Sequence, residues 1–380
     1  MSISRRSLIR AAVVASVGAM TPGFSRLAKA AGFGGGVWPE VAGAATDEAA
    51  GWRTFELTTK VSVLKPNGVT RVWVPAVLPN SLPFQKSLAN TIGTVGGTGT
   101  VDSSAENWLA IAYGEFPAGV APVMTVTSRV ATRPYFVDLN LPGSAAPLSE
   151  AERAYYLRAT KLQPTDGIVR DTALRITKGA TTDVDKTRAI YEWIVENTFR
   201  NPKTRGCGLG DIRFMLESGD LGGKCADLNA LFVGLCRAAD VPARHAYGIR
   251  VAKSELGYKS LGPATDNITH AQHCRAEVFL SGYGWVPMDP ADVRKVVLEE
   301  GPGNLALDND MVVKARKRLF GSWEMNWIAY NFANDIELPG EDGATLPFLM
   351  YTQGETGGAK IDPYDQEHFV YEITAKEISA

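Results

Sequence analysis

The hydrophobic pattern of the chain changes near Ser149, and this change most limits the folds that the chain can adopt. From Trp52 to about Asp138 apolar residues alternate with polar ones, and Lys65-Pro66-Asn67-Gly68 has the composition of a hairpin turn. From Ser149 onward apolar residues recur with the period of an α-helix, and Ser149 and Glu152 form a capping-box pattern. The sequence therefore predicts an antiparallel β domain followed by a helical segment.

The helical segment is expected to lead into a second set of strands. Helices are predicted over residues 168–178 and 183–197, and from Cys225 to about Pro242, because proline cannot continue a helix. Strands are predicted over residues 246–251, 275–280 and 285–288, with further candidates over 327–332, 346–351 and 369–373. A helical lobe that leads into an antiparallel sheet predicts an α+β core.

The charge of the chain argues against a nucleic-acid partner. Its 39 basic and 41 acidic side chains give a formal net charge of −2 and are spread along the sequence. No stripe of lysine and arginine is available to neutralise a phosphate backbone. The hydrophobic fraction of 45% is that of a globular protein with one large core or several smaller ones.

The first thirty residues have the layout of an export signal. Ser4-Arg5-Arg6-Ser7-Leu8-Ile9-Arg10 precedes an apolar run from Ala11 to Met20 and a small-x-small site that ends at Ala30. The paired arginines resemble a twin-arginine signal, so we expect the twin-arginine export machinery as a partner and a periplasmic or secreted location. Roughly ten apolar residues are too few to cross a bilayer, and no later stretch is long and apolar enough to do so, so no stable membrane insertion is expected.

The four cysteines form no metal-binding or disulfide pattern in the sequence. Cys207, Cys225, Cys236 and Cys274 include no C-x-x-C pair and have no regular spacing. A zinc ribbon or a disulfide scaffold is therefore disfavoured. Two of them could pair in an oxidising compartment, and the sequence does not say which.

Cys225 lies at the predicted start of an apolar helix, directly after Gly222, Gly223 and Lys224. The unpaired amide groups and the positive dipole end of a helix N-terminus favour a thiolate, and a thiolate is the reactive form of cysteine. The glycines would allow a substrate backbone to approach closely. A buried cysteine with no chemical role is the ordinary alternative, and Cys236, further along the same helix, is expected to be of that kind.

Two predicted strands flank Ser281-Gly282-Tyr283-Gly284 and are expected to form a hairpin. If the turn is centred near residue 281, His273 and Asp289 lie opposite each other on the same face at its open end. A carboxylate beside an imidazole fixes its tautomer and stabilises the imidazolium, which a thiol–imidazole pair requires.

Two stretches together resemble the core of the transglutaminase-like superfamily. The first is Gly-Lys-Cys-Ala-Asp, residues 223–227, with the apolar segment 230–244 behind it. The second runs over residues 273–290, His-x-x-x-Glu-Val-Phe-Leu-x-Gly-Tyr-Gly-Trp-Val-Pro-x-Asp-Pro. The resemblance covers residues 183–292 and implies a papain-like or transglutaminase-like fold.

The resemblance implies a catalytic triad of Cys225, His273 and Asp289, with no cofactor and no metal. The implied reaction is cysteine-dependent acyl transfer on amide bonds of a peptide or protein substrate through a thioester, by hydrolysis or transamidation. The backbone N–H of Cys225 is an expected oxyanion donor, and no second donor is assigned. Arg275 departs from the family pattern, because many relatives carry an aromatic residue two positions after the histidine.

These expectations divide the chain into five parts. They are a signal peptide over 1–30, a flexible mature N-terminus over 31–50, a β-rich domain over 51–145, a transglutaminase-like catalytic core over 146–300, and a C-terminal β extension of the core over 301–380. Substrate identity and oligomeric state are not predicted.

Two other interpretations were weighed. His270, His273 and Cys274 could form a metal cluster that Cys207 or an aspartate completes. However, His270 and His273 would lie on opposite faces of a strand and on no helix that aligns them. The chain could also be an inactive member of the family that uses its β domains as a peptide-binding scaffold. The intact set of cysteine, histidine and aspartate argues against that second interpretation.

Overall fold

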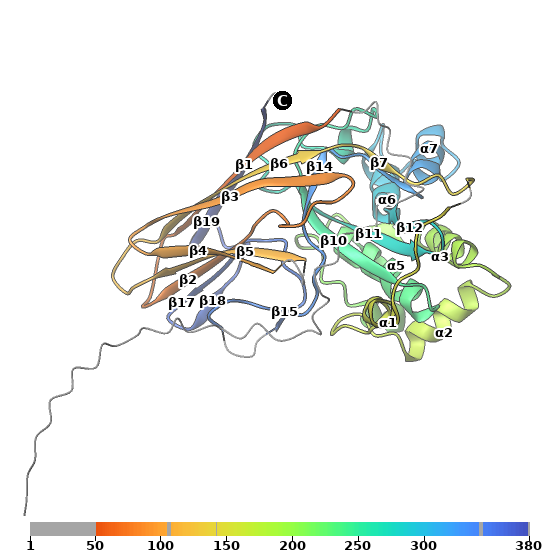
Figure 1. Ribbon diagram of the computed structural model, residues 1–380, viewed down its shortest axis with the longest axis horizontal. Coiled ribbons are helices and arrows are strands. Elements are labelled where there is room, and N and C mark those ends of the chain that lie inside the picture. The colour runs from red at the N-terminus through yellow and green to blue at the C-terminus, as the bar shows by residue number, and fades with distance from the viewer. Residues whose placement is uncertain (1–50, 105–107, 142, 342–344, 379–380) are drawn as a thin grey trace, which may run out of the picture.

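The computed structural model describes residues 51–104, 108–141, 143–341 and 345–378 (Figure 1). The expected signal peptide and mature N-terminus, residues 1–50, lie outside the described residues. Figure 1 shows one half of the molecule built of strands and another half in which helices pack around strands β10, β11 and β12. Within the described part of the chain, no helix is long and apolar enough to cross a membrane.

Two antiparallel sheets form the β-rich half. The first has the order β19-β1-β6-β3 and the second the order β18-β17-β2-β5-β4. Their strands are β1 (Arg53–Val63), β2 (Thr70–Pro75), β3 (Gln85–Val95), β4 (Thr98–Ser104), β5 (Leu109–Phe116), β6 (Val123–Thr132), β17 (Gln353–Thr356), β18 (Ala359–Ile361) and β19 (Phe369–Ile378). Residues 55, 57 and 61, which alternate along β1, are buried against Val72 and Phe116 of the second sheet.

The C-terminal part of the chain contributes to both halves. β19 pairs with β1 along its whole length, from Thr54 opposite Ile378 to Val63 opposite Phe369. In contrast, β14 (Trp327–Asn331) pairs with a strand of the helical half. The two halves therefore share strands, and the apolar cluster of the β sheets includes Ile249 and Ile328 from the other half.

The helical half is built on the sheet β12-β11-β10-β14, whose strands are β10 (Ala243–Arg250), β11 (Gln272–Leu280), β12 (Gly284–Met288) and β14. The helices are α1 (Glu150–Leu157), α2 (Gly167–Ile176), α3 (Asp183–Asn197), α4 (Ile212–Ser218), α5 (Cys225–Ala238), α6 (Pro290–Glu299) and α7 (Asp310–Arg318), with a 3-10 turn at Lys259–Leu261. Short strands complete the fold: β7 (Tyr135–Phe136), β8 (Phe199–Arg200), β9 (Gly222–Gly223), β13 (Ser322–Trp323), β15 (Ile336–Glu337) and β16 (Thr345–Leu346).

α5 is the central helix of this half, and every one of its residues is buried. It packs on β11 and β10 on one side and on α2 and α3 on the other. Its sequence allows this position because the helix is apolar almost all round. The α+β fold class predicted from the sequence, with a helical lobe packed on an antiparallel sheet, is confirmed.

Candidate active site

The start of α5 is held by a network of backbone contacts to Asp227. Its carboxylate accepts hydrogen bonds from the backbone N–H groups of Leu209, Gly210 and Lys224, each at 3.0 Å. A Cβ on Gly223 would lie 2.5 Å from the Asp227 side chain, so only glycine fits there. These contacts fix Cys225 at the first position of the helix, so the Asp227 carboxylate organises the helix start.

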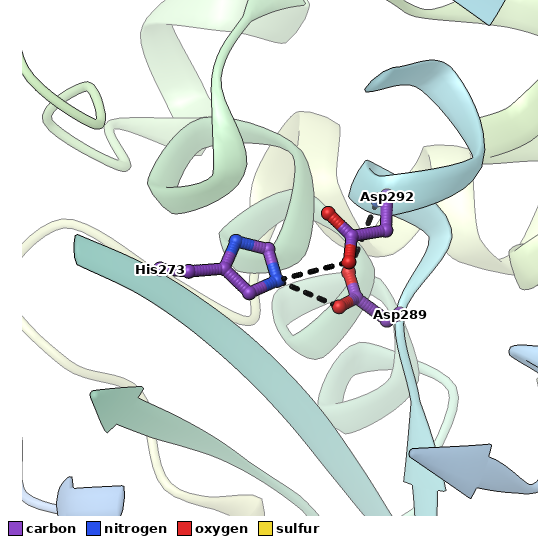
Figure 2. Close-up of side chains that lie close together, drawn as sticks. All are labelled: His273, Asp289 and Asp292. Carbon is purple, nitrogen blue, oxygen red and sulfur yellow. Dashed lines mark hydrogen bonds and ion pairs between the residues drawn. The ribbon is translucent and has the colours of Figure 1, made fainter. Parts of the chain in front are cut away.

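His273 lies near the start of β11, and its imidazole points at two carboxylates (Figure 2). Its Nε2 lies 2.7 Å from Asp289 Oδ2 and 3.4 Å from Asp292 Oδ2. The backbone is fixed from behind, because the Trp327 indole donates to the His273 carbonyl oxygen at 2.8 Å. Gly248, opposite His273, leaves room for that indole, since a Cβ there would lie 2.5 Å from the Trp327 ring.

The turn of the hairpin lies one residue later than predicted, so the partner of each strand residue shifts by two positions. Ala276 pairs with Met288 and Leu280 with Gly284, so the turn is centred at residue 282. Continuing this register places Asp289 opposite Arg275 and diagonal to His273. A shift of two residues keeps side chains on the same face, and for that reason the predicted contact between His273 and Asp289 still forms.

Asp289 is held by more groups than the sequence indicated. It is the N-cap residue of α6, and its Oδ1 accepts from the Asp292 backbone N–H at 3.1 Å. Asn229, one helical turn after Cys225, donates its side-chain amide to the same oxygen at 3.2 Å and to the Cys274 carbonyl at 2.9 Å. Arg275 Nε lies 3.5 Å from Asp289 Oδ2. The carboxylate is therefore fixed from three directions.

A second buried carboxylate, Asp292, was missed by sequence reasoning. Arg250 at the end of β10 makes two hydrogen bonds to it, at 2.6 and 2.7 Å. Asp289 and Asp292 are fully buried, and so are the two guanidinium groups beside them. Two carboxylates are thus matched by Arg250 and Arg275. The Asp-Pro-x-Asp pattern that starts α6 was the signal that could have indicated Asp292.

Arg275, the departure from the family pattern, lies behind the site. Its guanidinium stacks over the rings of Trp327 and Trp323, at 4.8 and 5.4 Å from their centroids, and donates to the Glu324 carbonyl at 3.0 Å. Burial lowers its pKa to about 10, so it stays charged at neutral pH. It lies beside Asp289 and does not line the cavity that Cys225 lines.

Cys225 is surrounded by two further thiols. All four cysteines are free, and the Cys207 and Cys274 thiols lie near enough to Cys225 to lower its pKa. The Cys207 thiol is also 3.3 Å from the Gln272 carbonyl oxygen. Its single proton can serve only one of these acceptors at a time, and a thiolate at Cys225 is the stronger one.

The local charges favour a thiolate–imidazolium pair. Hydrogen bonds from Cys207 and Cys274 lower the pKa of Cys225 well below its ordinary value against the effect of burial, and contact with His273 adds to this. For His273, burial and the Arg250 charge lower the pKa, but the carboxylates of Asp292 and Asp289 outweigh them and the net direction is upward. Each group thus favours the charged form of the other.

Cys225 and His273 open onto a cavity of about 480 Å³, whereas Asp289 lies behind them. The cavity is also lined by Cys207, Tyr351 and Tyr364. The structure therefore brings the three sequence-predicted site residues together, with the thiol and the imidazole exposed to a space that could receive a ligand. His270 lines the same cavity without joining the cluster of carboxylates.

Among the described residues, His273, Asp289 and Asp292 form a group compact enough to hold a metal ion. Arg250 and Arg275 already supply positive charge to both carboxylates. A cation placed between them would compete with two buried guanidinium groups. The metal hypothesis drawn from the sequence, His270, His273 and Cys274 with Cys207 or an aspartate, shares His273 and at most one aspartate with this group. The donor set therefore fits an ion-paired network better than a metal site.

Replacing Cys207 by alanine should raise the pKa of Cys225, because the thiol that donates to the thiolate is removed. The rate of iodoacetamide alkylation at Cys225, measured against pH, should then rise at a higher pH than in the unmodified protein. Cys236→Ala is the matched control, since Cys236 is buried on the same helix away from this cluster. An unchanged profile for Cys207→Ala would show that Cys207 does not donate to Cys225.

Comparisons with known proteins place this site within a family. The sequence profile of the Transglutaminase-like superfamily matches residues 170–290. An uncharacterized protein of Haemophilus influenzae is 39% identical over 232 residues, which are 59% of this chain and 62% of the relative. The aligned region thus spans less than two thirds of that relative's length.

Two solved structures match this chain, and they differ in how closely they match. A putative cysteine protease from Cytophaga hutchinsonii matches with a TM-score of 0.50 at 15% identity, over 86% of this chain and 98% of that one. The periplasmic domain of TgpA from Pseudomonas aeruginosa matches at 13% identity over 62% of this chain and 90% of that one, and its TM-score of 0.34 is too low to support an inference. The first likeness shows a common fold. Residues 170–290, which contain Cys225, His273 and Asp289, therefore form a transglutaminase-like domain.

Proposed function

We propose that the chain catalyses cysteine-dependent acyl transfer on amide bonds of peptides or proteins, with Cys225 as nucleophile, His273 as proton carrier and Asp289 as the group that orients His273. The observation that carries the proposal is the position of His273, which lines the same cavity as Cys225 and whose imidazole lies 2.7 Å from the Asp289 carboxylate. The thiol and the imidazole line the cavity, where an amide could reach them.

The proposed reaction begins with attack of the Cys225 thiolate on the amide carbonyl carbon. The carbonyl π electrons move to oxygen, and the C–N bond then breaks while the His273 imidazolium donates its proton to the leaving amine. A thioester remains on Cys225. Water or a second amine, deprotonated by His273, attacks this thioester and releases the acyl product, and the proton returns to the imidazole.

Backbone contacts support the Cys225 N–H as the oxyanion donor. The Lys224 N–H is taken by the Asp227 carboxylate at 3.0 Å, and the Ala226 N–H by the Cys207 carbonyl at 2.9 Å. Of these three consecutive amides, that of Cys225 has no partner among the described residues. We propose that it stabilises the developing negative charge on the carbonyl oxygen.

Alkylation with iodoacetamide at neutral pH tests the choice of nucleophile. Cys225 should be labelled rapidly and stoichiometrically, while the folded protein keeps Cys236 unlabelled, because burial raises the pKa of Cys236 well above its ordinary value. Peptide mass spectrometry identifies the modified residue. Equal labelling of both, or labelling of Cys207 alone, would instead favour an inactive peptide-binding scaffold.

The proposal includes two possible fates of the thioester, hydrolysis and transamidation. Inclusion of a fluorescent primary amine with a peptide substrate separates transamidation, which attaches the amine, from hydrolysis, which does not.

A periplasmic or secreted location rests on Arg5 and Arg6 ahead of a short apolar run. Recovery of the protein only from the cytoplasmic fraction of its native cell would contradict that location.

A further inference from the structure

The cavity in front of Cys225 is lined by basic side chains and by no acidic one among the described residues. Four of its lining residues are Arg200, Lys224, Arg250 and Lys295. The rest of the lining is neutral or histidine. A cavity of about 480 Å³ at this position accommodates a few side chains of a substrate, so its charge bears directly on what the site selects.

The basic residues are only partly neutralised by carboxylates outside the cavity. Arg250 is matched by Asp292, which it contacts at 2.6 Å. Arg200 and Lys295 share one carboxylate, that of Glu299, at 2.5 and 3.7 Å. No ion pair joins Lys224 to another of the described residues. Arg200, Lys295 and Lys224 thus have a single carboxylate among them, that of Glu299, and an excess of two positive charges remains.

The excess charge lies where solvent screens it weakly. The side chains of Arg200 and Lys295 are 14% and 19% exposed, on elements that flank the start of α5. Burial lowers the pKa of Lys295, and the Arg250 charge adds to this, which reflects the lack of a sufficient counter-charge. A negative group of a ligand would relieve that repulsion, and clefts lined by one sign of charge concentrate ligands of the other.

We infer that this cavity selects peptide substrates that carry a carboxylate close to the amide attacked by Cys225. The inference rests on the proposed function and adds the substrate class to it. The carboxylate could belong to an acidic side chain or to the C-terminus of the peptide. In either position Lys295 and Lys224 contact it and draw the neighbouring amide toward the sulfur.

Two alkylating reagents that differ mainly in charge test this without a known substrate. In both, the Cys225 thiolate forms an S–C bond and iodide leaves, but iodoacetate is anionic and iodoacetamide is neutral. The rate of iodoacetate divided by the rate of iodoacetamide is measured at Cys225 and, as a reference, on N-acetylcysteine amide in solution. The ratio at Cys225 divided by the reference ratio, here called the normalised ratio, should be about ten at low salt. The ratio should fall as ionic strength rises.

Charge-removing variants locate the effect. Lys295→Gln and Lys224→Gln should each lower the normalised ratio severalfold, because each removes one positive charge from the lining of the cavity. Lys314→Gln removes the same charge from an exposed position of α7 and should leave the ratio unchanged. A peptide library with free or amidated C-termini then shows whether acidic side chains or terminal carboxylates are enriched among the converted members.

The outcomes separate the two claims. A normalised ratio near one, or one that Lys314→Gln lowers as much as Lys295→Gln does, would overturn the inference and leave Cys225 as nucleophile. If neither iodoacetate nor iodoacetamide alkylates Cys225, the proposed function itself is overturned.

Discussion

Replacing Cys225 by alanine should abolish acyl transfer, with a loss of roughly a thousandfold or more in kcat, because it removes the proposed nucleophile beside His273 in the cavity. The fold should remain, since Cys225 is a small side chain at the start of a helix fixed by Asp227. The rate of peptide conversion and the far-UV circular dichroism of the purified variant measure the two effects.

Cys236→Ala is the matched control for this substitution. It removes a thiol from the same helix, at a position that is fully buried, and it should change stability slightly while activity persists. Residual activity in Cys225→Ala of more than a few per cent would mean that another residue carries the nucleophilic step.

Replacing Arg250 by methionine should destabilise the protein by about 3–5 kcal/mol, because it leaves the carboxylate of Asp292 buried without its ion-pair partner. The Arg250 charge also lowers the pKa of His273, so its removal should raise that pKa further. If His273 must be protonated to release the amine, the falling limb of the pH–rate profile moves to higher pH. Urea unfolding and kcat/KM measured against pH provide the two readouts.

Two further variants separate the stability effect from the effect on the site. Asp292→Asn combined with Arg250→Met removes both charges and should recover part of the lost stability. Arg244→Met breaks the other buried pair of β10, in which Arg244 contacts Glu277 at 2.7 Å, and should lose comparable stability while the pH profile stays in place. A stability loss below 1 kcal/mol in Arg250→Met would contradict the account of a charge-balanced network.

Local sequence information was enough to predict the elements that carry Cys225, His273 and Asp289. Gly222 and Gly223 before an apolar run indicated the helix start, and the apolar strands around Ser281 indicated the hairpin. The parity of the strand positions placed His273 and Asp289 on one face even though the predicted turn was off by one residue. Side-chain alternation survives such an error, whereas the identity of the directly opposed residue does not.

The supporting residues could not be predicted in the same way, because their roles depend on distant parts of the chain. Arg250 meets Asp292 across 42 positions, and Asn229 meets Asp289 across 60. No periodicity links such positions, and a buried charge looks in sequence like any exposed one. The proximity of Cys207 to Cys225 was likewise not predicted, since it depends on a loop fixed by the Asp227 carboxylate.

The pairing partners of the C-terminal strands could not be predicted from the sequence either. The segment 369–373 read as a strand, but nothing in it indicated that it would pair with residues near the other end of the chain. Pairing between distant strands is decided by the fit of two apolar faces, which single-strand patterns do not encode.

The central claim is that Cys225 forms a thioester, and trapping that intermediate tests it most directly. The protein is mixed with N-acetyl amino acid p-nitrophenyl esters, quenched in acid within seconds and measured by intact and peptide mass spectrometry. We expect one acyl group per molecule, located on Cys225, removed by hydroxylamine, and formed much faster than on Cys236 or on a free thiol. Slow acylation at the rate of a free thiol, or an acyl group on any other residue, would contradict the account.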